Sequence, residues 1–390
     1  MKVCVIIPSF YPAEVYGGWI ASSLSIYKEL ALKGVKIYVS TTNDNGNEYL
    51  TSNSHQYVKL SDNLYVKYYP QLIRERFSIS LLLNLYKDIA ANDIVRVHGI
   101  FSQTTPFGLF FAAVLGKKVI ISPHGCLGQW CLSDGSRLKK VYLALFVKPF
   151  ANRITWHATS QQEAEEIKNL FPTANGYVIP HGIEFKDYET QEELNREEYI
   201  KKYTGMSVNK GKIIVSMGRL HRKKGFDLLI RAFRETLTEH SDALLMIAGG
   251  DFGEQKILEE LILELKLKDK VFLVGHLTGR DKIIFLANAD LFVLASHNEN
   301  FGMVYAEAMA LGTPVVASIH TPWRELEDLG LGKCIDNNVA NISLAINKML
   351  EKDLSFIGVM AKQYIINKYS IAKSGLRFLS LFSNLLGEKK

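Results

Sequence analysis

Two glutamates stand eight positions apart in the segment LFVLASHNENFGMVYAEAMALGTPVVAS, residues 291–318. Glu299 follows an apolar run typical of a buried strand, and Glu307 lies in a segment whose Ala, Glu and Met content favours a helix. A buried carboxylate without a partner is costly, so we expect a polar group to meet Glu307. The alternative is a pair of solvated glutamates beside an ordinary strand-to-helix turn.

A second polar segment, SMGRLHRKKG, supplies cations at the end of another apolar run. It places Arg219 and Lys224 between Gly218 and Gly225. Loops at strand ends commonly carry binding residues, and a group of cations in such a loop attracts an anion. The alternative is a solvated basic turn.

Glycines precede two of the predicted helices. Gly302 comes directly before MVYAEAMALG, where free backbone N–H groups and the helix dipole favour an anionic ligand, and a glycine lets that ligand approach closely. Gly17 and Gly18, in YPAEVYGGW, offer the same arrangement after the first apolar run. A plain helix start is the alternative for this glycine pair.

Histidines followed by glycine end three strand-like runs, at His98, His124 and His181. Polar side chains at a strand end are well placed for ligand contact, which we favour over a structural role for His124. His98 is as readily structural as functional. We expect His181 to mark the passage into a second domain.

These residues need a scaffold of alternating strands and helices. Strand-like runs are spaced by amphipathic segments in both halves of the chain, which predicts an α/β protein with two doubly wound, Rossmann-like parallel sheets. We expect a first domain over residues 1–183, a charged linker over 184–211, a second domain over 212–365 and a helix over 366–390 that could pack on either domain. Such sheets bind ligands at the carboxyl ends of their strands, so the predicted site lies in a cleft between the domains.

Composition excludes several classes of protein. The 390 residues are 47% hydrophobic, as in folded globular proteins, and the four cysteines form no zinc or disulfide pattern. No apolar stretch is long enough for a membrane span or a signal peptide, so we expect a cytoplasmic protein, soluble or lying on the inner face of the membrane. The first strand-like run ends in PSFYP, without the glycine pattern of nicotinamide oxidoreductases.

The net charge of +6 belongs to one half of the chain. Residues 1–182 hold 18 Lys and Arg against 12 Asp and Glu, and the rest is balanced. No basic stripe with interleaved aromatics indicates a nucleic-acid partner. The segment SRLKKVYLALFVKPF reads as a basic amphipathic helix that binds an anionic membrane surface, or as a core helix whose lysines extend to solvent.

The chain resembles the retaining glycosyltransferases of family four, which have the two-domain GT-B fold. The resemblance runs over nearly the whole chain and is carried by Glu299 and Glu307 in NFGMVYAEAMALGTPVV, together with SMGRLHRKKG. It implies that Arg219 and Lys224 grip the diphosphate of a nucleotide sugar. Fixed cations there would stabilise the leaving group without rearrangement.

The resemblance also implies roles for the other residues. Glu307 would bind the ribose hydroxyls, and Glu299 would hold the donor sugar, with reaction on one face favoured over a covalent adduct on Glu299. His124 would contact the donor sugar and His98 the acceptor. The remaining expected donor contacts are Gly17, Gly18, Gly218, Asn300, Phe301, Gly302, Met303 and Val304.

The implied activity is transfer of a hexose from a nucleotide-diphosphate sugar to a glycan acceptor, such as a polyprenyl-diphosphate-linked intermediate of bacterial O-antigen, capsule or exopolysaccharide. No Asp-x-Asp stands at a strand end, so we expect no metal or other cofactor, with Arg219 and Lys224 in its place. The alternative is a sugar-nucleotide 2-epimerase or hydrolase on the same fold. A non-catalytic nucleotide-sugar-binding protein would not need the intact glutamate pair.

Overall fold

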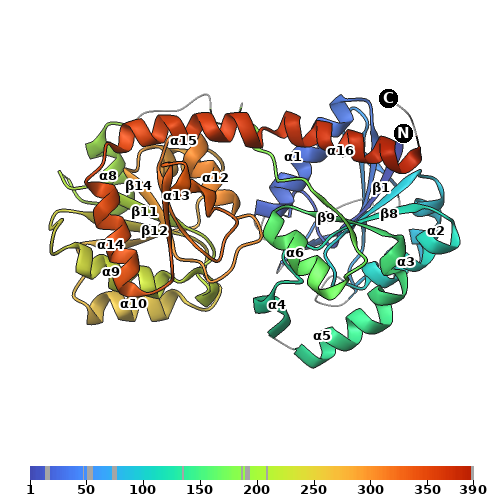
Figure 1. Cartoon of the computed structure of the whole chain (residues 1–390), viewed down its shortest axis with the longest axis horizontal. Helices are drawn as coiled ribbons and strands as arrows, with labels where there is room; N and C mark the ends of the chain where they lie inside the picture. The colour runs from blue at the N-terminus through green and yellow to red at the C-terminus, as the bar shows by residue number, and fades with distance from the viewer. Residues whose placement is uncertain are drawn as a thin grey trace. The chain divides into compact units, whose positions relative to one another are not determined.

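The computed structural model describes residues 1–13, 18–46, 48–50, 56–72, 77–133, 136–185, 188, 194–207 and 210–387. The chain forms two compact units, the first made of Met1–Gly182 with Ile371–Lys390 and the second of Ile183–Ser370 (Figure 1). The chain therefore passes between the units twice, after Gly182 and after Ser370.

The first unit is built on an eight-stranded sheet in the order β10-β9-β8-β7-β1-β2-β6-β5. Its strands are β1 (Lys2–Ile6), β2 (Lys36–Thr42), β5 (Val58–Ser61), β6 (Leu64–Tyr69), β7 (Ile94–His98), β8 (Lys118–Ser122), β9 (Ile154–Ala158) and β10 (Asn175–Val178). Neighbours pair in parallel except β5, which pairs antiparallel with β6 at the edge. A short separate ribbon joins β3 (Asp44–Asn45) and β4 (Glu48–Tyr49).

Helices cover both faces of this sheet, because side chains alternate along each strand. The helical elements are α1 (Gly18–Leu32), α2 (Ile79–Ala90), α3 (Thr104–Val114), α4 (Gln129–Ser133), α5 (Ser136–Tyr142), η2 (Leu143–Val147), η3 (Lys148–Arg153), α6 (Gln161–Leu170) and α16 (Ile371–Leu386). Val3 and Val5 of β1 pack with α1 and α16, whereas Cys4 and Ile6 pack with α2 and α3. The last helix of the chain therefore completes one face of the first unit (Figure 1).

The second unit has a six-stranded parallel sheet in the order β13-β12-β11-β14-β15-β16. Its strands are β11 (Ile213–Met217), β12 (Leu244–Ala248), β13 (Val271–Gly275), β14 (Leu291–Leu294), β15 (Val315–Ser318) and β16 (Gly332–Ile335). In chain order this is the doubly wound arrangement 3-2-1-4-5-6. The order of the strands reverses between β11 and β14, and a ligand crevice is expected at that point.

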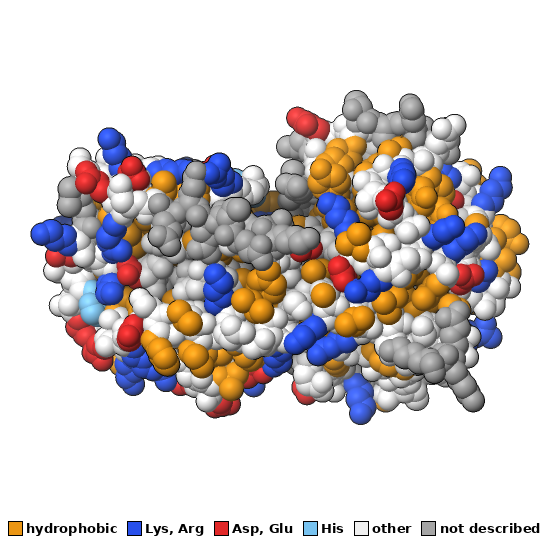
Figure 2. All heavy atoms as spheres, turned by 90° about the horizontal axis from the view of Figure 1, so that it is seen from above, with side chains coloured by type: hydrophobic (Ala, Val, Ile, Leu, Met, Phe, Trp, Pro, Cys, Tyr) orange, Lys and Arg blue, Asp and Glu red, His pale blue; other side chains and the backbone are white. Residues whose placement is uncertain are grey.

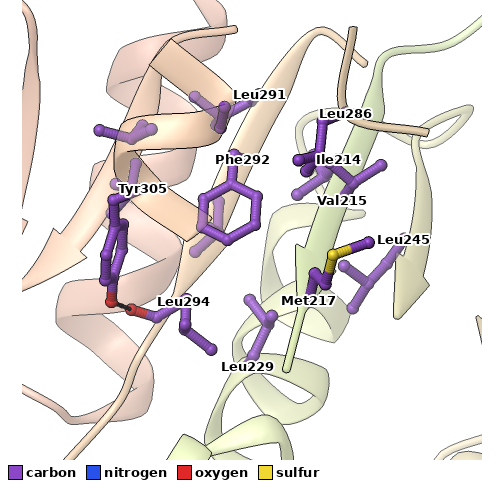
Figure 3. Close-up of a cluster of buried hydrophobic side chains, with 14 of the residues drawn as sticks. Ile214, Val215, Met217, Leu229, Leu245, Leu286, Leu291, Phe292, Leu294 and Tyr305 are labelled. Atoms are coloured by element: carbon purple, nitrogen blue, oxygen red, sulfur yellow. Dashed lines mark hydrogen bonds between the residues drawn. The ribbon is translucent and has the colours of Figure 1, made fainter. Parts of the chain in front are cut away.

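The helices of the second unit are α8 (Arg196–Thr204), η4 (Arg222–Lys224), α9 (Phe226–Thr236), α10 (Gln255–Glu264), α11 (Gly279–Ala287), α12 (Met303–Ala310), α13 (Glu325–Asp328), α14 (Val339–Leu350) and α15 (Leu354–Tyr369). The central strands are apolar on both faces and fully buried (Figure 3). Phe292 of β14 meets the Tyr305 ring of α12 edge to face at 5.6 Å, and the Tyr305 hydroxyl donates to the Leu294 carbonyl at 2.7 Å. This packing holds α12 against the strand that precedes it.

The two parallel sheets confirm the predicted fold class. The two short strands of the β3–β4 ribbon and three strands of the sheets were not predicted from the sequence. The three sheet strands are β5, β6 and β16, which are short or carry polar side chains on one side. Each lies toward the edge of its sheet, where one-sided burial gives a weaker apolar signal than the central strands have.

The predicted linker over 184–211 is wrong in its described part, because α8 belongs to the second unit. Tyr199 and Ile200 are fully buried there, and the Tyr199 hydroxyl donates to the Phe285 carbonyl at 2.7 Å. Charged residues flank Tyr199 and Ile200 in the sequence, so this helix shows no apolar periodicity. A capping box between Asn195 and Glu198 is the signal in the sequence that marks the helix.

Candidate active site

The crevice expected in the second unit lies between two loops, residues 218–225 after β11 and residues 295–302 after β14. They meet because β11 and β14 are neighbours in the sheet. Gly225 has φ +64°, and a Cβ at this position would lie 2.3 Å from the Ala295 carbonyl oxygen. Only glycine allows the loops to approach so closely, and the approach brings Lys224 beside the second loop.

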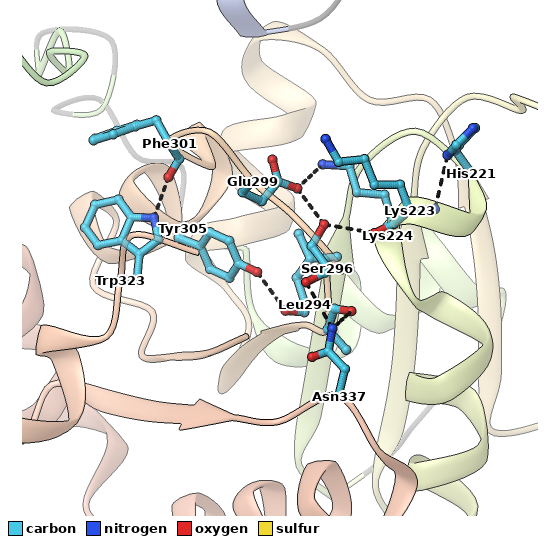
Figure 4. Close-up of polar contacts among 11 residues, drawn as sticks. His221, Lys223, Lys224, Leu294, Ser296, Glu299, Phe301, Tyr305, Trp323 and Asn337 are labelled. Carbon is cyan, nitrogen blue, oxygen red and sulfur yellow. Dashed lines mark hydrogen bonds and ion pairs between the residues drawn. The ribbon is translucent and has the colours of Figure 1, made fainter. Parts of the chain in front are cut away.

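Lys224 and Glu299 form an ion pair across the crevice, with 2.5 Å between Nζ and Oε1 (Figure 4). The Ser296 hydroxyl donates to the same Oε1 at 2.7 Å and lies 3.2 Å from the Lys223 carbonyl oxygen. Among the described residues only Oε1 of this carboxylate is hydrogen-bonded, so Oε2 can accept from a substrate hydroxyl. The structure thus joins two of the residues predicted from sequence.

The carboxyl of Glu299 is ionised at neutral pH. Burial opposes its charge, but the ammonium of Lys224, the nearby charge of Lys223 and the hydroxyl of Ser296 hold its pKa below the ordinary value. An ionised carboxylate accepts hydrogen bonds and stabilises positive charge. It is poorly suited to donate a proton.

Arg219 lies in the same loop but does not join the pair. Its side chain is exposed, and its guanidinium lies 5.1 Å from the ring centroid of Phe252, which follows β12. His221 begins η4 by accepting a hydrogen bond from the Lys223 N–H on Nδ1 at 3.1 Å. Arg219 and Lys224 therefore offer cations at different points of the loop.

The N-terminus of α12 opens onto the same crevice. Gly302 caps it with φ 71°, and no side chain accepts from the first turn. Phe301 is buried, and its carbonyl accepts a hydrogen bond from the indole N–H of Trp323 at 2.6 Å, which anchors the loop (Figure 4). Asn300 carries a buried Oδ1 that has no partner among the described residues. The backbone N–H groups of Met303 and Val304 thus stand at a helix end without a side-chain cap, where an anion is favoured.

Glu307 has a protein partner that sequence reasoning missed. Lys282 of α11 places Nζ 2.6 Å from its Oε1, and the Glu307 side chain is 9% exposed. The expectation of a polar group beside this carboxylate is confirmed, but the group comes from the chain itself. Nothing in the segment GRDKIIFLANA distinguishes Lys282 from a solvated helix lysine, because the contact depends on how α11 packs against α12.

The histidines predicted from the first unit also come together. His98 at the end of β7 contacts His124 after β8, with 2.7 Å between Nδ1 and Nε2, and its Nε2 is hydrogen-bonded to the Tyr27 hydroxyl. The rings of His98 and His124 stack at 4.9 Å, and those of His124 and His181 at 5.8 Å. His124 has φ 54°, an uncommon backbone conformation outside glycine, which turns its side chain into this cluster.

Burial keeps this cluster neutral. It lowers the pKa values of His98 and His124, and the charge of Arg96 and the neighbouring histidines lower them further. Burial and Arg96 lower the pKa of His181 to about 4. Each neutral imidazole has one donor and one acceptor nitrogen, so the histidines can form a continuous chain of hydrogen bonds.

Gly18 is the first residue of α1, as predicted, and Gly17 lies outside the described residues. Gly218 lies against the side chain of Lys224. A Cβ added at Gly218 would lie 3.2 Å from Cε of Lys224, so the glycine makes room for that lysine.

The part of the chain that the structure describes has neither a cluster of metal ligands nor a membrane-spanning helix. No group of three or more His, Cys, Asp or Glu side chains is arranged to hold a metal ion there. No helix in that part has the length and apolar character of a membrane span. On the face drawn in Figure 2, Lys and Arg side chains lie scattered among other types rather than in one stripe.

Two protein families match the chain, one in each half. The family described as "Glycosyl transferases group 1" matches residues 197–370, and "Glycosyltransferase Family 4" matches residues 16–186. The first match contains the crevice with Lys224 and Glu299. The second contains the histidine cluster.

Individual relatives match over shorter stretches. Mannosylfructose-phosphate synthase of Agrobacterium fabrum is 36% identical over 37% of this chain and 32% of its own length. The capsular polysaccharide biosynthesis glycosyltransferase CapM of Staphylococcus aureus is 30% identical over 37% of both chains. The chain thus spans about a third of the length of these curated relatives.

Solved structures agree with the fold over nearly the whole chain. The crystal structure of Anabaena Alr3699/HepE in complex with UDP-glucose superimposes with a TM-score of 0.77 at 19% identity, covering 98% of this chain and 100% of that one. At this identity the likeness concerns the fold.

Proposed function

We propose, because this chain belongs to glycosyltransferase family 4, that it is a retaining enzyme that transfers a hexose from a nucleotide-diphosphate sugar to a glycan acceptor. The observation that carries the proposal is the Lys224–Glu299 pair in the crevice between β11 and β14. A cation and an ionised carboxylate lie within one hydrogen bond of each other, beside the N-terminus of α12. A diphosphate and a sugar ring carry the groups that these two side chains would bind.

The chemistry follows from the charges in the crevice. As the bond between the sugar and the diphosphate breaks, negative charge develops on the leaving phosphate, and Lys224, Arg219 and the α12 N-terminus stabilise it. Positive charge develops on the sugar, where the Glu299 carboxylate stabilises it and its Oε2 holds a hydroxyl. No proton is needed from Glu299, which agrees with its lowered pKa. The leaving phosphate assists the acceptor hydroxyl on the same face, which retains the configuration.

The reaction needs no metal ion in this proposal. The cations of Lys224 and Arg219 take the place of a bridging metal at the diphosphate. Glu307 binds the ribose hydroxyls through its carboxylate, with Lys282 holding it in place. The UDP-glucose bound to the fold relative supports a nucleotide sugar as the donor.

A glycan acceptor on a membrane lipid is supported by one face of the first unit. Helix α3 exposes Phe107, Phe110 and Val114, and the neighbouring helix α5 exposes Leu138 (81%) and Val141 (54%). Arg137, Lys140 and Lys148 are exposed in the same segment. Apolar side chains flanked by cations suit the surface of an anionic membrane, and we infer that this face holds the protein at the cytoplasmic leaflet. The relation to a capsular polysaccharide enzyme supports a lipid-linked intermediate of a bacterial surface glycan as the acceptor.

Donor and activity are tested in two steps. A thermal-shift panel of UDP-, GDP-, dTDP- and ADP-sugars identifies the donor, because stabilisation grows with affinity. The selected donor is then incubated with and without membrane lipid extract, and the product anomer is determined by NMR. Transfer with retained configuration is expected only when acceptor is present. Stoichiometric release of nucleotide from donor alone would favour the alternative, a sugar-nucleotide 2-epimerase or hydrolase.

A further inference from the structure

The first unit buries a cation for which the described residues provide no anion. Arg96 in the middle of β7 is 2% exposed. No Asp or Glu among the described residues pairs with it, and its Nε and Nη1 have no hydrogen-bond partner there. Its remaining nitrogen, Nη2, lies 3.5 Å from the Ser122 hydroxyl, at the limit of a hydrogen bond. Buried arginines are ordinarily paired, so this one is unusual.

Two aromatic rings contact the guanidinium of Arg96. Its central carbon lies 4.1 Å from the ring centroid of Phe378 and 5.3 Å from that of Tyr27. These contacts stabilise the positive charge by cation–π attraction. They do not supply a hydrogen-bond acceptor, so the N–H groups on Nε and Nη1 still lack one among the described residues.

The hydrogen bonds around Arg96 can be assigned from their partners. His157 faces the Ile179 carbonyl with Nε2 at 2.8 Å, so Nε2 carries the proton, and Nδ1 accepts from the Ser122 hydroxyl at 2.8 Å. Ser122 therefore uses its only proton on His157 and can offer Arg96 a lone pair only at long range. The neutral His157 adds no negative charge beside the guanidinium.

A second chain of hydrogen bonds ends at the same place. If the Tyr27 hydroxyl donates to Nε2 of His98, then His98 donates from Nδ1 to Nε2 of His124. His124 then carries its proton on Nδ1, which is buried and without a partner among the described residues. Both chains leave donors, not acceptors, unsatisfied.

These donors border a small cavity of about 10 Å³. Arg96, His124, His157 and His181 line it together with Ser374 and Phe378 of α16 and the segment 179–182. A volume of this size holds one small ion or a water molecule. All of these lining residues belong to the first unit, and two parts of the wall lie next to the chain passages, residues 179–182 before the first passage and α16 after the second.

We propose that this cavity binds a small monovalent inorganic anion of about chloride's size, held by the edge of Arg96 and by the Nδ1–H of His124. The anion neutralises the buried guanidinium and links β7, the loop after β8 and α16. It also stabilises the tautomer of His124 that carries its proton on Nδ1, the tautomer expected when Tyr27 donates to His98. The site lies within the first unit, and its existence does not depend on the proposed transfer reaction.

Thermal unfolding of the full chain tests this site. The melting temperature is measured in potassium chloride and in potassium gluconate at equal ionic strength, since gluconate is too large for the cavity. Chloride is expected to raise the melting temperature by about 2–4 °C over gluconate. The shift should vanish in Arg96→Met and persist in Arg377→Met, which removes an exposed cation of α16. Equal melting in both salts, or a shift that survives Arg96→Met, would overturn the proposal.

Crystals of the unaltered protein provide a second measurement that does not require the variant to fold. Soaking in bromide and collecting data at the bromine absorption edge should give an anomalous peak beside Arg96. Electron density of a water with no anomalous signal at that position would count against an anion site.

Discussion

Lys224 has two tasks at the residue scale, since it pairs with Glu299 and, in the proposed reaction, contacts the donor phosphate. Three N–H donors let an ammonium keep its carboxylate partner while contacting a phosphate. The role of each residue in the crevice therefore depends on its neighbours. Variants separate the contributions.

Lys224→Ala should lower kcat/KM for the nucleotide sugar by about 100-fold to 1,000-fold, because one fixed charge at the leaving group is lost. Steady-state kinetics with a matched Arg222→Ala variant measures this, since Arg222 is an exposed cation of the same loop. Arg222→Ala should stay near the unaltered rate. Full activity of Lys224→Ala would remove Lys224 from the site.

The pH dependence of stability reports the same pair. A lowered pKa means that Glu299 contributes stability above its ordinary value of 4.5, and that this contribution is lost as the pH falls through the lower folded value. Lys224→Met should raise the folded pKa of Glu299 toward or above its ordinary value, so the loss of stability on acidification below pH 4.5 should shrink or reverse. Urea unfolding between pH 3 and pH 7 in about half-unit steps measures the shift. Superimposable profiles would show that the ion pair does not set this pKa.

Lys282→Met should destabilise the second unit by about 1–3 kcal/mol, because it leaves the buried Glu307 carboxylate unpaired. The matched control is Lys202→Met, which breaks the exposed pair with Asp281 and should cost less than about 1 kcal/mol. Adding Glu307→Gln to Lys282→Met should recover part of the loss. Equal costs for both lysines in chemical denaturation would contradict a structural role for the buried pair.

Gly225→Ala tests the close approach of the two crevice loops. It places a side chain at φ +64° and 2.3 Å from the Ala295 oxygen, which should cost about 2–5 kcal/mol and lower activity. Gly205→Ala is the control, since Gly205 has φ +74° with open space around an added Cβ. It measures the backbone strain alone, about 1 kcal/mol. Similar losses of stability and activity in both variants would argue against the loop contact.

At the scale of elements, the exposure of α5 distinguishes a membrane-surface helix from a core helix, the two interpretations of its basic amphipathic sequence. A core helix would bury its apolar side chains, but Leu138 and Val141 are exposed and only Leu143 and Val147 of the following η2 are buried. Lys139 turns inward and donates to the Cys131 carbonyl at 2.6 Å. The segment is therefore anchored at one side and presents an apolar side with cations to its surroundings.

Leu138→Glu with Val141→Glu should weaken binding to vesicles of phosphatidylcholine and phosphatidylglycerol by at least about tenfold, because it replaces apolar contact by repulsion. Cosedimentation measures this. Leu329→Glu, at an exposed position of the second unit, is the control and should bind as the unaltered protein does. Unchanged binding of the double variant would remove α5 from the membrane-contacting face.

At the scale of the whole molecule, each unit has its own core, and α16 supplies part of the first although it follows the second in the chain. Phe382 of α16 and Met349 of α14 are both fully buried, each in the core of its own unit. Removing either side chain leaves a cavity in one unit only.

Phe382→Ala should lower the free energy of unfolding of the first unit by about 3–5 kcal/mol, and Met349→Ala that of the second unit by about 2–5 kcal/mol. Each variant should therefore lower the temperature of one calorimetric transition only. The donor nucleotide sugar should raise the transition that Met349→Ala lowers, because the crevice lies in the second unit. A single transition that moves equally in both variants would show that the units unfold together.

The sequence by itself determined the fold class, the central strands and several residues of the crevice. Lys224, Glu299 and Gly302 stand beside strongly apolar strands, where glycine and charge at a strand end have few structural explanations. Central strands of a parallel sheet are apolar on both faces, so their signal is strong. The strands β5, β6 and β16 gave weaker signals and were missed, and α8 was assigned to a linker.

Only the tertiary structure decided which residues are partners. Lys282 and Glu307 lie on different helices, and Arg96 meets Phe378 from the far end of the chain. No local pattern encodes such contacts, because they depend on the order of strands in the sheet and on the packing of helices over it. A lysine on a helix and an arginine in a strand look ordinary in the sequence. Their burial beside a carboxylate, or without one, is what makes them informative.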